Sequence, residues 1–318
     1  MAGTVRIGVV APHGDLAIAE ACDDETRTLA VATQQAMDEM GRRVAASGAD
    51  CVVVATPHNV HVTGHMAVIT ASSVSGSIED AADPLPRTWP ADRELALASV
   101  EAMTGAGVPT VGVSFGGNQA SESVAPLDWG GHVPLWHIER HAPDIPVVVV
   151  SPARDLDATA HAEAGRAIVR AARSAGRGVA FVASADQGHG HRPDGPYGFA
   201  AESAAFDARM VDLVRRGALG ELMVFDPADV LAAMADSWWQ MVMLHGALDE
   251  DGGTFRSRLL AYEAPTYYGM LTAVFEPGGI GGEAVASLPT MAVPWLRRLR
   301  HSFYRWRHRR LYPWRYAS

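Results

Sequence analysis

VRIGVVAPHG, residues 5–14, is an apolar run rich in β-branched residues that ends in a Pro-His pair. CVVVATPHN, residues 51–59, repeats this pattern further along the chain. The apolar parts of these two stretches, 5–11 and 51–56, predict strands. Three more such runs, at 108–114, 146–151 and 179–184, are also each bounded by Gly, Pro or polar residues. The stretches between the runs show helical periodicity. This alternation predicts an α/β fold with a central, largely parallel or mixed sheet covered by helices.

The helical periodicity predicts helices over 24–47, 92–105, 157–175, 199–216 and 227–245. Asp157, and either Asp226 or Asp229, are suitable N-cap residues, because their side chains accept hydrogen bonds from the free backbone N–H groups of a first helical turn. The segment 71–91 is rich in Ser, Ala, Asp and Pro and predicts a long loop.

The composition is that of a globular protein, with 48% hydrophobic and 19% charged residues in 318. No apolar run is long enough to cross a membrane, and the first residues lack the pattern of an export signal. We therefore expect a cytoplasmic protein without a transmembrane segment. The two cysteines are too few for a disulfide framework.

The charge is unevenly distributed along the chain. Residues 293–318 contain eight arginines and no acid, so the other residues carry a formal charge of −18, against −10 for the whole chain. An acidic body argues against nucleic acid as the main partner, since duplex binding depends on basic surface. Aromatic residues alternate with arginines in the tail, which favours a contact with an anionic surface or with the acidic body. Its role stays open.

Two strand-end histidines and one distant acid form the main functional pattern. His13 and His58 each follow a predicted strand, and Glu263 lies in AYEAPTYY, residues 261–268. The carboxyl ends of strands in an α/β sheet are where side chains from distant segments converge. Two imidazoles and one carboxylate are the ligand set of a mononuclear non-haem iron(II) site, which leaves one face of the metal open.

Together these residues resemble the type III extradiol ring-cleavage dioxygenases, the family that includes the β subunit of protocatechuate 4,5-dioxygenase. The resemblance covers roughly residues 4–277. It implies iron(II) bound by His13, His58 and Glu263, with a small aromatic substrate and O₂ as partners. The reaction would open a ring that bears vicinal hydroxyls, or a hydroxyl and an amine, and insert both atoms of O₂.

We therefore expect one catalytic domain over 1–277, followed by a linker and an Arg/aromatic-rich tail over 278–318. A homo-oligomer is the simpler expectation, although some family members need a second, small subunit.

The segment SADQGHGH, residues 184–191, resembles the part of the family that carries an acid/base histidine. His189 is the better match and His191 the alternative. An imidazole with a pKa near neutrality can take a proton from a catechol and return it during ring opening. A second family signature departs from the usual pattern in LDWGGHVPL, residues 127–135, where Trp129 stands in place of a histidine. His132 is the nearest replacement, unless the site uses a single base.

Three residues are candidates for the substrate pocket. Trp129 offers a flat indole for stacking on an aromatic ring, with packing in the core as an equal alternative. His61 either lines the pocket or has an ordinary structural role. Tyr267 shares a face with Glu263 if that stretch is helical.

Two other functions remain open from the residues alone. The same three ligands suit zinc and a hydrolytic reaction. A non-catalytic binding protein on the same scaffold is the second alternative.

Overall fold

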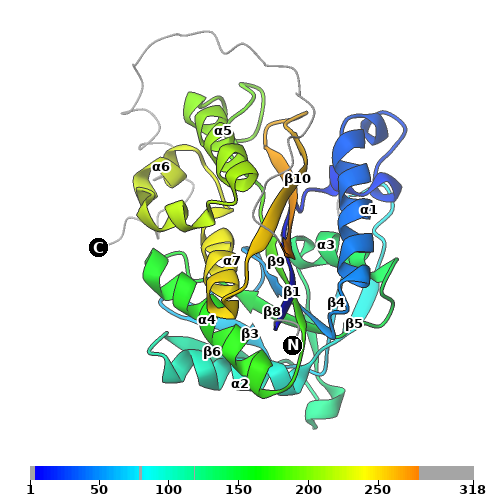
Figure 1. Ribbon diagram of the computed structural model, residues 1–318. Helices are drawn as coiled ribbons and strands as arrows, with labels where there is room; N and C mark the ends of the chain where they lie inside the picture. Colours follow the sequence, from blue (N-terminus) through cyan, green and yellow to red (C-terminus); the bar gives the residue numbers. More distant parts are fainter. Residues whose placement is uncertain (1–3, 79–80, 118, 279–318) are drawn as a thin grey trace. The chain divides into compact units, whose positions relative to one another are not determined.

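An eight-stranded mixed sheet forms the centre of the computed structural model, which describes residues 4–78, 81–117 and 119–278 (Figure 1). The strand order is β10-β11-β1-β9-β2-β8-β3-β6. The four central strands β1, β9, β2 and β8 run parallel, whereas β11 is antiparallel to β1 and β3 is antiparallel to β8. The strand bounds are β1 (Val5–Ala11), β2 (Cys51–Ala55), β3 (Met66–Ile69), β6 (Thr110–Val113), β8 (Val147–Ser151), β9 (Val179–Ser184), β10 (Phe255–Glu263) and β11 (Met270–Pro277).

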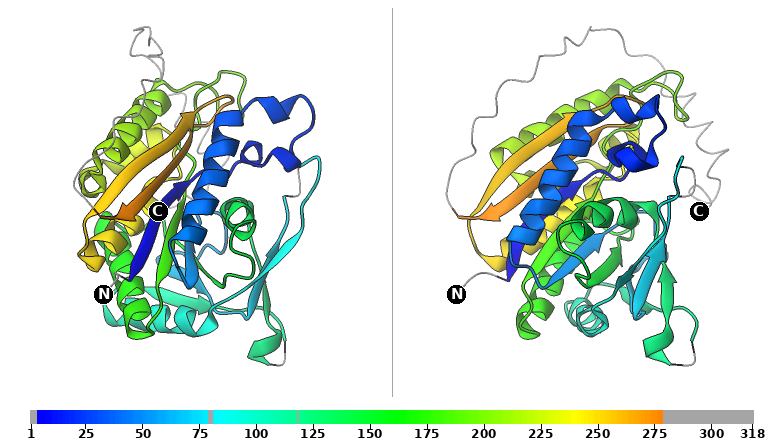
Figure 2. Two further views of the ribbon diagram at one scale, coloured as in Figure 1. Left: turned by 45° about the vertical axis from the view of Figure 1, so that its right-hand side comes forward. Right: turned by 90° about the vertical axis from the view of Figure 1, so that its right-hand side faces the viewer.

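Helices cover both faces of this sheet (Figures 1 and 2). The bounds are α1 (Val31–Ala46), α2 (Arg93–Gly105), α3 (Trp129–Glu139), α4 (Ala158–Ser174), α5 (Ala201–Arg216), α6 (Pro227–Ala232) and α7 (Trp238–Asp251). Among the described residues, the short 3₁₀ helices are η1 (Asp15–Ala17), η2 (Ala19–Ala21), η3 (Thr26–Thr28), η4 (Ala120–Glu122) and η5 (Leu219–Val224). Helices α1 and α3 lie on one face, and α2, α4, α5 and α7 lie on the other.

Strand β2 explains why the central runs are continuously apolar. Val52 and Val54 pack in the hydrophobic cluster that contains α1 and α3, while Cys51 and Val53 pack in the cluster that contains α4 and α7. Successive side chains of a strand point to opposite faces, so a sheet covered twice needs apolar residues at every position. The predicted α/β architecture is confirmed, with mixed rather than purely parallel pairing.

A second sheet has three strands in the order β5-β4-β7. These strands were not predicted from the sequence. Its strands are β4 (Ser73–Gly76), β5 (Arg87–Pro90) and β7 (Val124–Pro126). The prediction of one long loop over 71–91 is wrong, because β4 and β5 pair antiparallel within it. Strands β4 and β5 are short, and each has one large buried apolar residue, Val74 in β4 and Trp89 in β5. With one such residue per strand, the alternation of apolar and polar residues is too weak to indicate a strand from the sequence.

The predicted helix over 227–245 is two helices. Asp226 and Asp157 cap α6 and α4 as expected, accepting from the backbone N–H groups of Ala228 and Ala160. The chain then leaves the helix after Ala232, Met234 takes a positive φ of 53°, and α7 begins at Trp238. This break has a functional consequence, because it contains Asp236.

The described residues belong to one compact unit. The domain boundary after 277 and the role of the Arg/aromatic-rich tail stay predictions, since residues 279–318 lie outside the part that the structure describes. Within the described residues no helix is both long and apolar enough to cross a membrane.

Candidate metal site

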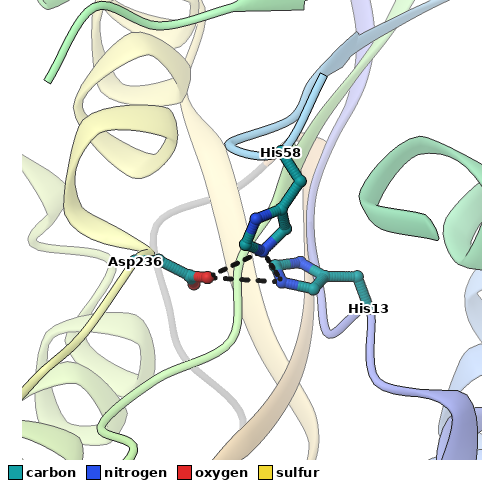
Figure 3. Close-up of side chains that lie close together, drawn as sticks. All are labelled: His13, His58 and Asp236. Carbon is teal, nitrogen blue, oxygen red and sulfur yellow. Dashed lines mark hydrogen bonds and ion pairs between the residues drawn. The ribbon is translucent and has the colours of Figure 1, made fainter. Parts of the chain in front are cut away.

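Three side chains from distant segments meet at the carboxyl ends of β1 and β2 (Figure 3). His13 follows β1, His58 follows β2, and Asp236 lies in the break between α6 and α7. The Nε2 atom of His58 is 3.1 Å from Nε2 of His13 and 3.0 Å from Oδ2 of Asp236. Asp236 Oδ2 is 3.5 Å from His13 Nε2. We call these three residues the strand-end site. They are the only such group of potential metal ligands in the described ranges.

The separations of these atoms suit the ligands of one metal ion. For bonds of about 2.1 Å, neighbouring ligand atoms lie about 3.0 Å apart at octahedral angles and about 3.4 Å apart at tetrahedral angles. The second oxygen of Asp236, Oδ1, is buried without a hydrogen-bond partner among the described residues. A buried, unpaired carboxylate oxygen is costly in an apolar interior. The two imidazoles and the carboxylate therefore fit a divalent cation.

His13 is held in one orientation by a serine. Ser184, the last residue of β9, lies with its Oγ 2.9 Å from His13 Nδ1 and donates its own proton to the carbonyl oxygen of Gly130 at 2.5 Å. A hydroxyl has one proton, so Ser184 accepts from Nδ1–H of His13. Nε2 faces His58 and Asp236, and it is the nitrogen whose lone pair would bind a cation when the cation displaces its proton.

Two buried carboxyl groups, those of Asp186 and Asp236, lie next to His13 in the site. Burial opposes ionisation of His13, but Asp186 and Asp236 outweigh this and raise its pKa to about 9. Burial also opposes ionisation of Asp236, yet His13 and His58 hold the pKa of this carboxyl well below its usual range. Asp186 accepts from the backbone N–H of His13 at 3.0 Å, and burial raises the pKa of its carboxyl. Such a cluster is stabilised by positive charge.

The first turn of α3 frames the site. Asp128 caps this helix through the N–H of Gly131 and accepts a hydrogen bond of 2.6 Å from Thr56, which directly follows β2. A side chain at Gly130 would collide with Thr56 and Asp128, so the close approach of the turn to β2 requires glycine. The turn is thereby fixed to the strand that carries His58.

Trp129, a predicted pocket residue, lies beside a metal-ligand candidate. Its indole stacks on the His58 ring, with centroids 4.5 Å apart and an interplanar angle of 26°. Trp129 is 48% exposed, and the His58 side chain is 24% exposed. The exposed indole argues against the alternative of a tryptophan packed in the core.

The structure does not bring Glu263 to the two histidines. Glu263 ends β10, and its Oε1 accepts a hydrogen bond of 2.7 Å from the backbone N–H of Thr33 in the first turn of α1. Asp236 lies beside the imidazoles in its place. Sequence reasoning missed Asp236 because 227–245 was read as one helix. The Asp236-Ser237 pair was the available signal, since both residues favour helix starts over helix interiors.

His189, the predicted acid/base residue, follows β9 and is half-buried. Its ring lies 5.8–6.0 Å, between centroids, from the rings of Tyr197, Tyr267 and Tyr268. Its Nδ1 is buried without a partner in the described part of the chain, and a positive charge on its ring would help to lower the pKa of Asp236. His189 therefore lies within electrostatic range of the strand-end site.

Tyr267, a predicted pocket residue, packs against His189. Burial, followed by Tyr197 and Asp186, raises the pKa of Tyr267 to about 12, so this phenol lies near the acidic groups of the site and stays protonated at neutral pH. The condition of a helix shared with Glu263 is not met, because β10 ends at Glu263 and bends follow it.

The other three candidates have different surroundings. His191 donates from Nε2 to the carboxylate of Asp207 at 2.8 Å, and Asp207 also accepts from the hydroxyl of Tyr262. His132 is fully buried between Trp89 and Trp136, and burial lowers its pKa to about 4. His61 is exposed. Their proposed roles in catalysis or substrate binding stay predictions, and the contacts of His132 and His191 are those of structural residues.

The fold and the strand-end site together define an α/β protein with a candidate metal centre at the carboxyl ends of its parallel strands. Residues 9–275 match the family described as the catalytic LigB subunit of aromatic ring-opening dioxygenase. The match covers most of the chain, and the chain belongs to this family. The resemblance inferred from His13, His58 and the LDWGGHVPL segment is confirmed at the level of the family.

Two further proteins are similar to this chain. Protein CA_C1420 of Clostridium acetobutylicum is 23% identical over 253 residues, which are 79% of this chain and 53% of that protein. The chain thus spans about half the length of this curated relative. The crystal structure of the uncharacterised protein JW3007 from Escherichia coli K12 aligns with a TM-score of 0.54 and 17% identity, over 84% of this chain and 98% of that one. This likeness shows a shared fold.

Proposed function

We propose that this chain is a non-haem iron(II)-dependent extradiol dioxygenase that cleaves a catecholic or 2-aminophenolic ring. The observation that carries the proposal is the convergence of His13 Nε2, His58 Nε2 and Asp236 Oδ2 within 3.0–3.5 Å, in a member of a ring-opening dioxygenase family. When bound, iron(II) would hold the two ring heteroatoms beside O₂ and allow electron density to pass between them. In this proposal Asp236 replaces Glu263 as the carboxylate ligand.

Three aromatic residues near the site support an aromatic substrate. Trp129 presents an exposed indole over His58, and Tyr267 with Tyr197 flanks His189. Flat π surfaces of this kind bind aromatic rings by stacked or edge-to-face contacts. Trp129 would stack on the ring, while Tyr267 would donate a hydrogen bond from its protonated phenol to a polar substituent.

His189 is the proposed acid/base residue. It would accept a proton from a ring hydroxyl as the substrate binds and return a proton as the ring opens. The unpartnered Nδ1 of His189 and its electrostatic coupling to Asp186 and Asp236 favour this role. The backbone contact of Asp186 with His13 would hold the first ligand in place during turnover.

Reconstitution of the purified chain under anaerobic conditions tests this function. The protein is loaded with iron(II) or with zinc, and oxygen uptake is followed with catechols, protocatechuates and 2-aminophenols, together with the yellow ring-opened products. We expect oxygen uptake with iron(II) and none with zinc. Hydrolytic activity with zinc and no oxygen uptake with iron would favour the hydrolase. Failure to bind either metal would favour a binding protein.

Two histidine variants provide the matched control for this experiment. His58→Ala removes a proposed ligand and should abolish oxygen uptake. His65→Ala removes an exposed histidine seven residues further along, outside the strand-end site, and should leave uptake within about twofold of the unmodified chain. Equal loss in both variants would contradict the assignment of His58.

The active assembly and its location are also part of this proposal. We infer a cytoplasmic homo-oligomer that acts without a second, small subunit. Light scattering on the chain expressed alone, combined with the oxygen-uptake measurement, tests this directly. A chain that binds iron but turns over only after a second polypeptide is added would contradict it.

A further inference from the structure

Pro134 lies inside α3, where it removes one hydrogen bond of the helix. In an α-helix the carbonyl of residue 130 accepts from the N–H of residue 134. Proline has no N–H, so the carbonyl of Gly130 lacks its helical donor. A buried carbonyl without a donor must find one elsewhere.

Ser184 supplies that donor from a different part of the fold. Its Oγ–H points to the carbonyl of Gly130 at 2.5 Å, and both residues are buried. The single hydroxyl proton is thereby committed to Gly130. The lone pairs of Ser184 Oγ remain for His13 Nδ1, 2.9 Å away, which must then carry a proton.

We propose that Pro134 and Ser184 form a positioning relay for the metal site. Pro134 frees the Gly130 carbonyl, this carbonyl fixes the direction of the Ser184 hydroxyl, and the hydroxyl fixes the tautomer and ring orientation of His13. The result is a His13 whose Nε2 presents its lone pair to the metal. The relay rests on the proposed metal-binding role of the strand-end site, and it does not depend on which reaction the metal supports.

Neighbouring hydrogen bonds hold Gly130 and Ser184 in position. Asp128 and Thr56 fix the turn that contains Gly130 against β2. Gln240, in α7, donates from Nε2 to the backbone carbonyls of both Ser184 and Asp236, at 3.1 and 2.7 Å. Ser184 is therefore tied to one ligand through its side chain and to another through its backbone.

Zinc binding by the purified chain tests the relay without reference to catalysis. Affinities are measured by competition with a chromophoric chelator, for the unmodified chain and for Ser184→Ala and Ser184→Thr. Loss of a group that orients a metal-bound histidine typically weakens metal binding about 10- to 100-fold. We expect that loss for Ser184→Ala, and recovery to within about threefold for Ser184→Thr, which keeps the hydroxyl.

Ser151→Ala is the matched control. Ser151 is also the last residue of a central strand, β8, and is also buried, but its Oγ has no partner among the described residues. Its removal should leave zinc affinity unchanged. Pro134→Ala restores a helical donor for the Gly130 carbonyl and releases the Ser184 proton, so we expect about a three- to tenfold loss of affinity, smaller than that of Ser184→Ala.

Nitrogen-15 NMR of the zinc-loaded, unmodified chain gives a second readout that needs no variant to fold. We expect the His13 signals of a protonated Nδ1 and a metal-bound Nε2. An unprotonated Nδ1, or a folded Ser184→Ala chain that binds zinc as tightly as the unmodified chain, would overturn the relay. If the unmodified chain binds no zinc and no iron(II), the metal site itself fails and the relay fails with it. Zinc binding without oxygen chemistry would leave the relay standing while overturning the proposed function.

Discussion

The strand-end site and the β10-β11 edge of the sheet carry acidic side chains in opposite settings. Asp236 lies beside two imidazoles and keeps one buried oxygen without a partner in the described residues. Glu263, at the end of β10, accepts from the N–H of Thr33, the third residue of α1. The N-cap residue of α1 is Ala30, which has no side-chain acceptor, so Glu263 acts as a cap from a distant strand. The partners of a carboxylate, more than its spacing in the sequence, distinguish a ligand from a structural acid.

Among variants that leave the proposed metal ligands in place, the largest expected effect comes from His189, on the side of the strand-end site. His189→Gln should lower kcat by about 10²- to 10⁴-fold, because a positioned acid/base group contributes that range, while iron(II) affinity stays unchanged. His191→Gln is the control. It removes the contact with Asp207 and should reduce stability more than kcat. Oxygen uptake and iron titration on both variants measure this, and a kcat loss in His191→Gln as large as in His189→Gln would reverse the two roles.

Trp129 should have the next largest effect. Trp129→Ala removes the exposed indole that stacks on His58, and we expect KM to rise about tenfold, in line with the energy of one aromatic contact. Trp129→Phe keeps a smaller π surface and should recover most of the affinity. Steady-state kinetics with the best substrate of the panel measures KM for both. An unchanged KM in Trp129→Ala would remove the indole from the substrate-binding surface.

Glu263 should show the reverse behaviour, with an effect on stability and none on metal binding. Glu263→Ala removes the acceptor at the start of α1 and should lower the free energy of unfolding by about 1–2 kcal/mol. Urea unfolding measures this loss, and metal titration of the same variant should match the unmodified chain. A loss of metal affinity without a loss of stability would return Glu263 to the list of ligands.

The smallest effect concerns His161, a histidine in α4 that belongs to neither the strand-end site nor the β10-β11 edge. His161 is buried in α4 and donates from Nδ1 to the backbone carbonyl of Asp157, and burial lowers its pKa to about 4. A histidine with a depressed pKa in the folded state contributes stability that is complete above its unfolded pKa of about 6.5 and is lost as pH falls toward 4. The unfolded chain binds the extra proton in that window, so acid favours unfolding.

Urea unfolding at pH 7 and pH 5 tests this prediction. We expect His161→Gln to be less stable than the unmodified chain at pH 7 and to lose less stability on going to pH 5. The exposed His61→Gln should keep the pH dependence of the unmodified chain. An identical pH dependence in all three chains would show that His161 does not titrate with folding.

The central parallel strands could be predicted from the sequence, whereas the small sheet and the β10-β11 edge of the large sheet could not. Strand β1 matches its predicted range, and β2, β8 and β9 match theirs to within one residue, because strands buried on both faces need uninterrupted apolar runs. The small sheet β5-β4-β7 was missed because its strands have few buried apolar residues. Strands β10 and β11 were not predicted either, although both are longer than the central strands.

Part of the candidate site was predictable for the same reason. His13 and His58 follow central strands, and parallel strands bring their carboxyl ends together, so their meeting follows from the fold class. Asp236 lies in a break between helices, and no periodicity of the sequence places such a break in space. The link from Pro134 through Gly130 to Ser184 depends on contacts between α3 and β9, which only the tertiary structure provides.

The iron(II) content of two carboxylate variants tests the central claim most directly. Asp236→Ala and Glu263→Ala are loaded anaerobically beside the unmodified chain, and bound iron is measured after gel filtration. We predict one iron(II) per chain in the unmodified protein and in Glu263→Ala, and none in Asp236→Ala. Full iron content in a folded Asp236→Ala chain, with loss of iron in Glu263→Ala, would contradict the assignment of the metal site.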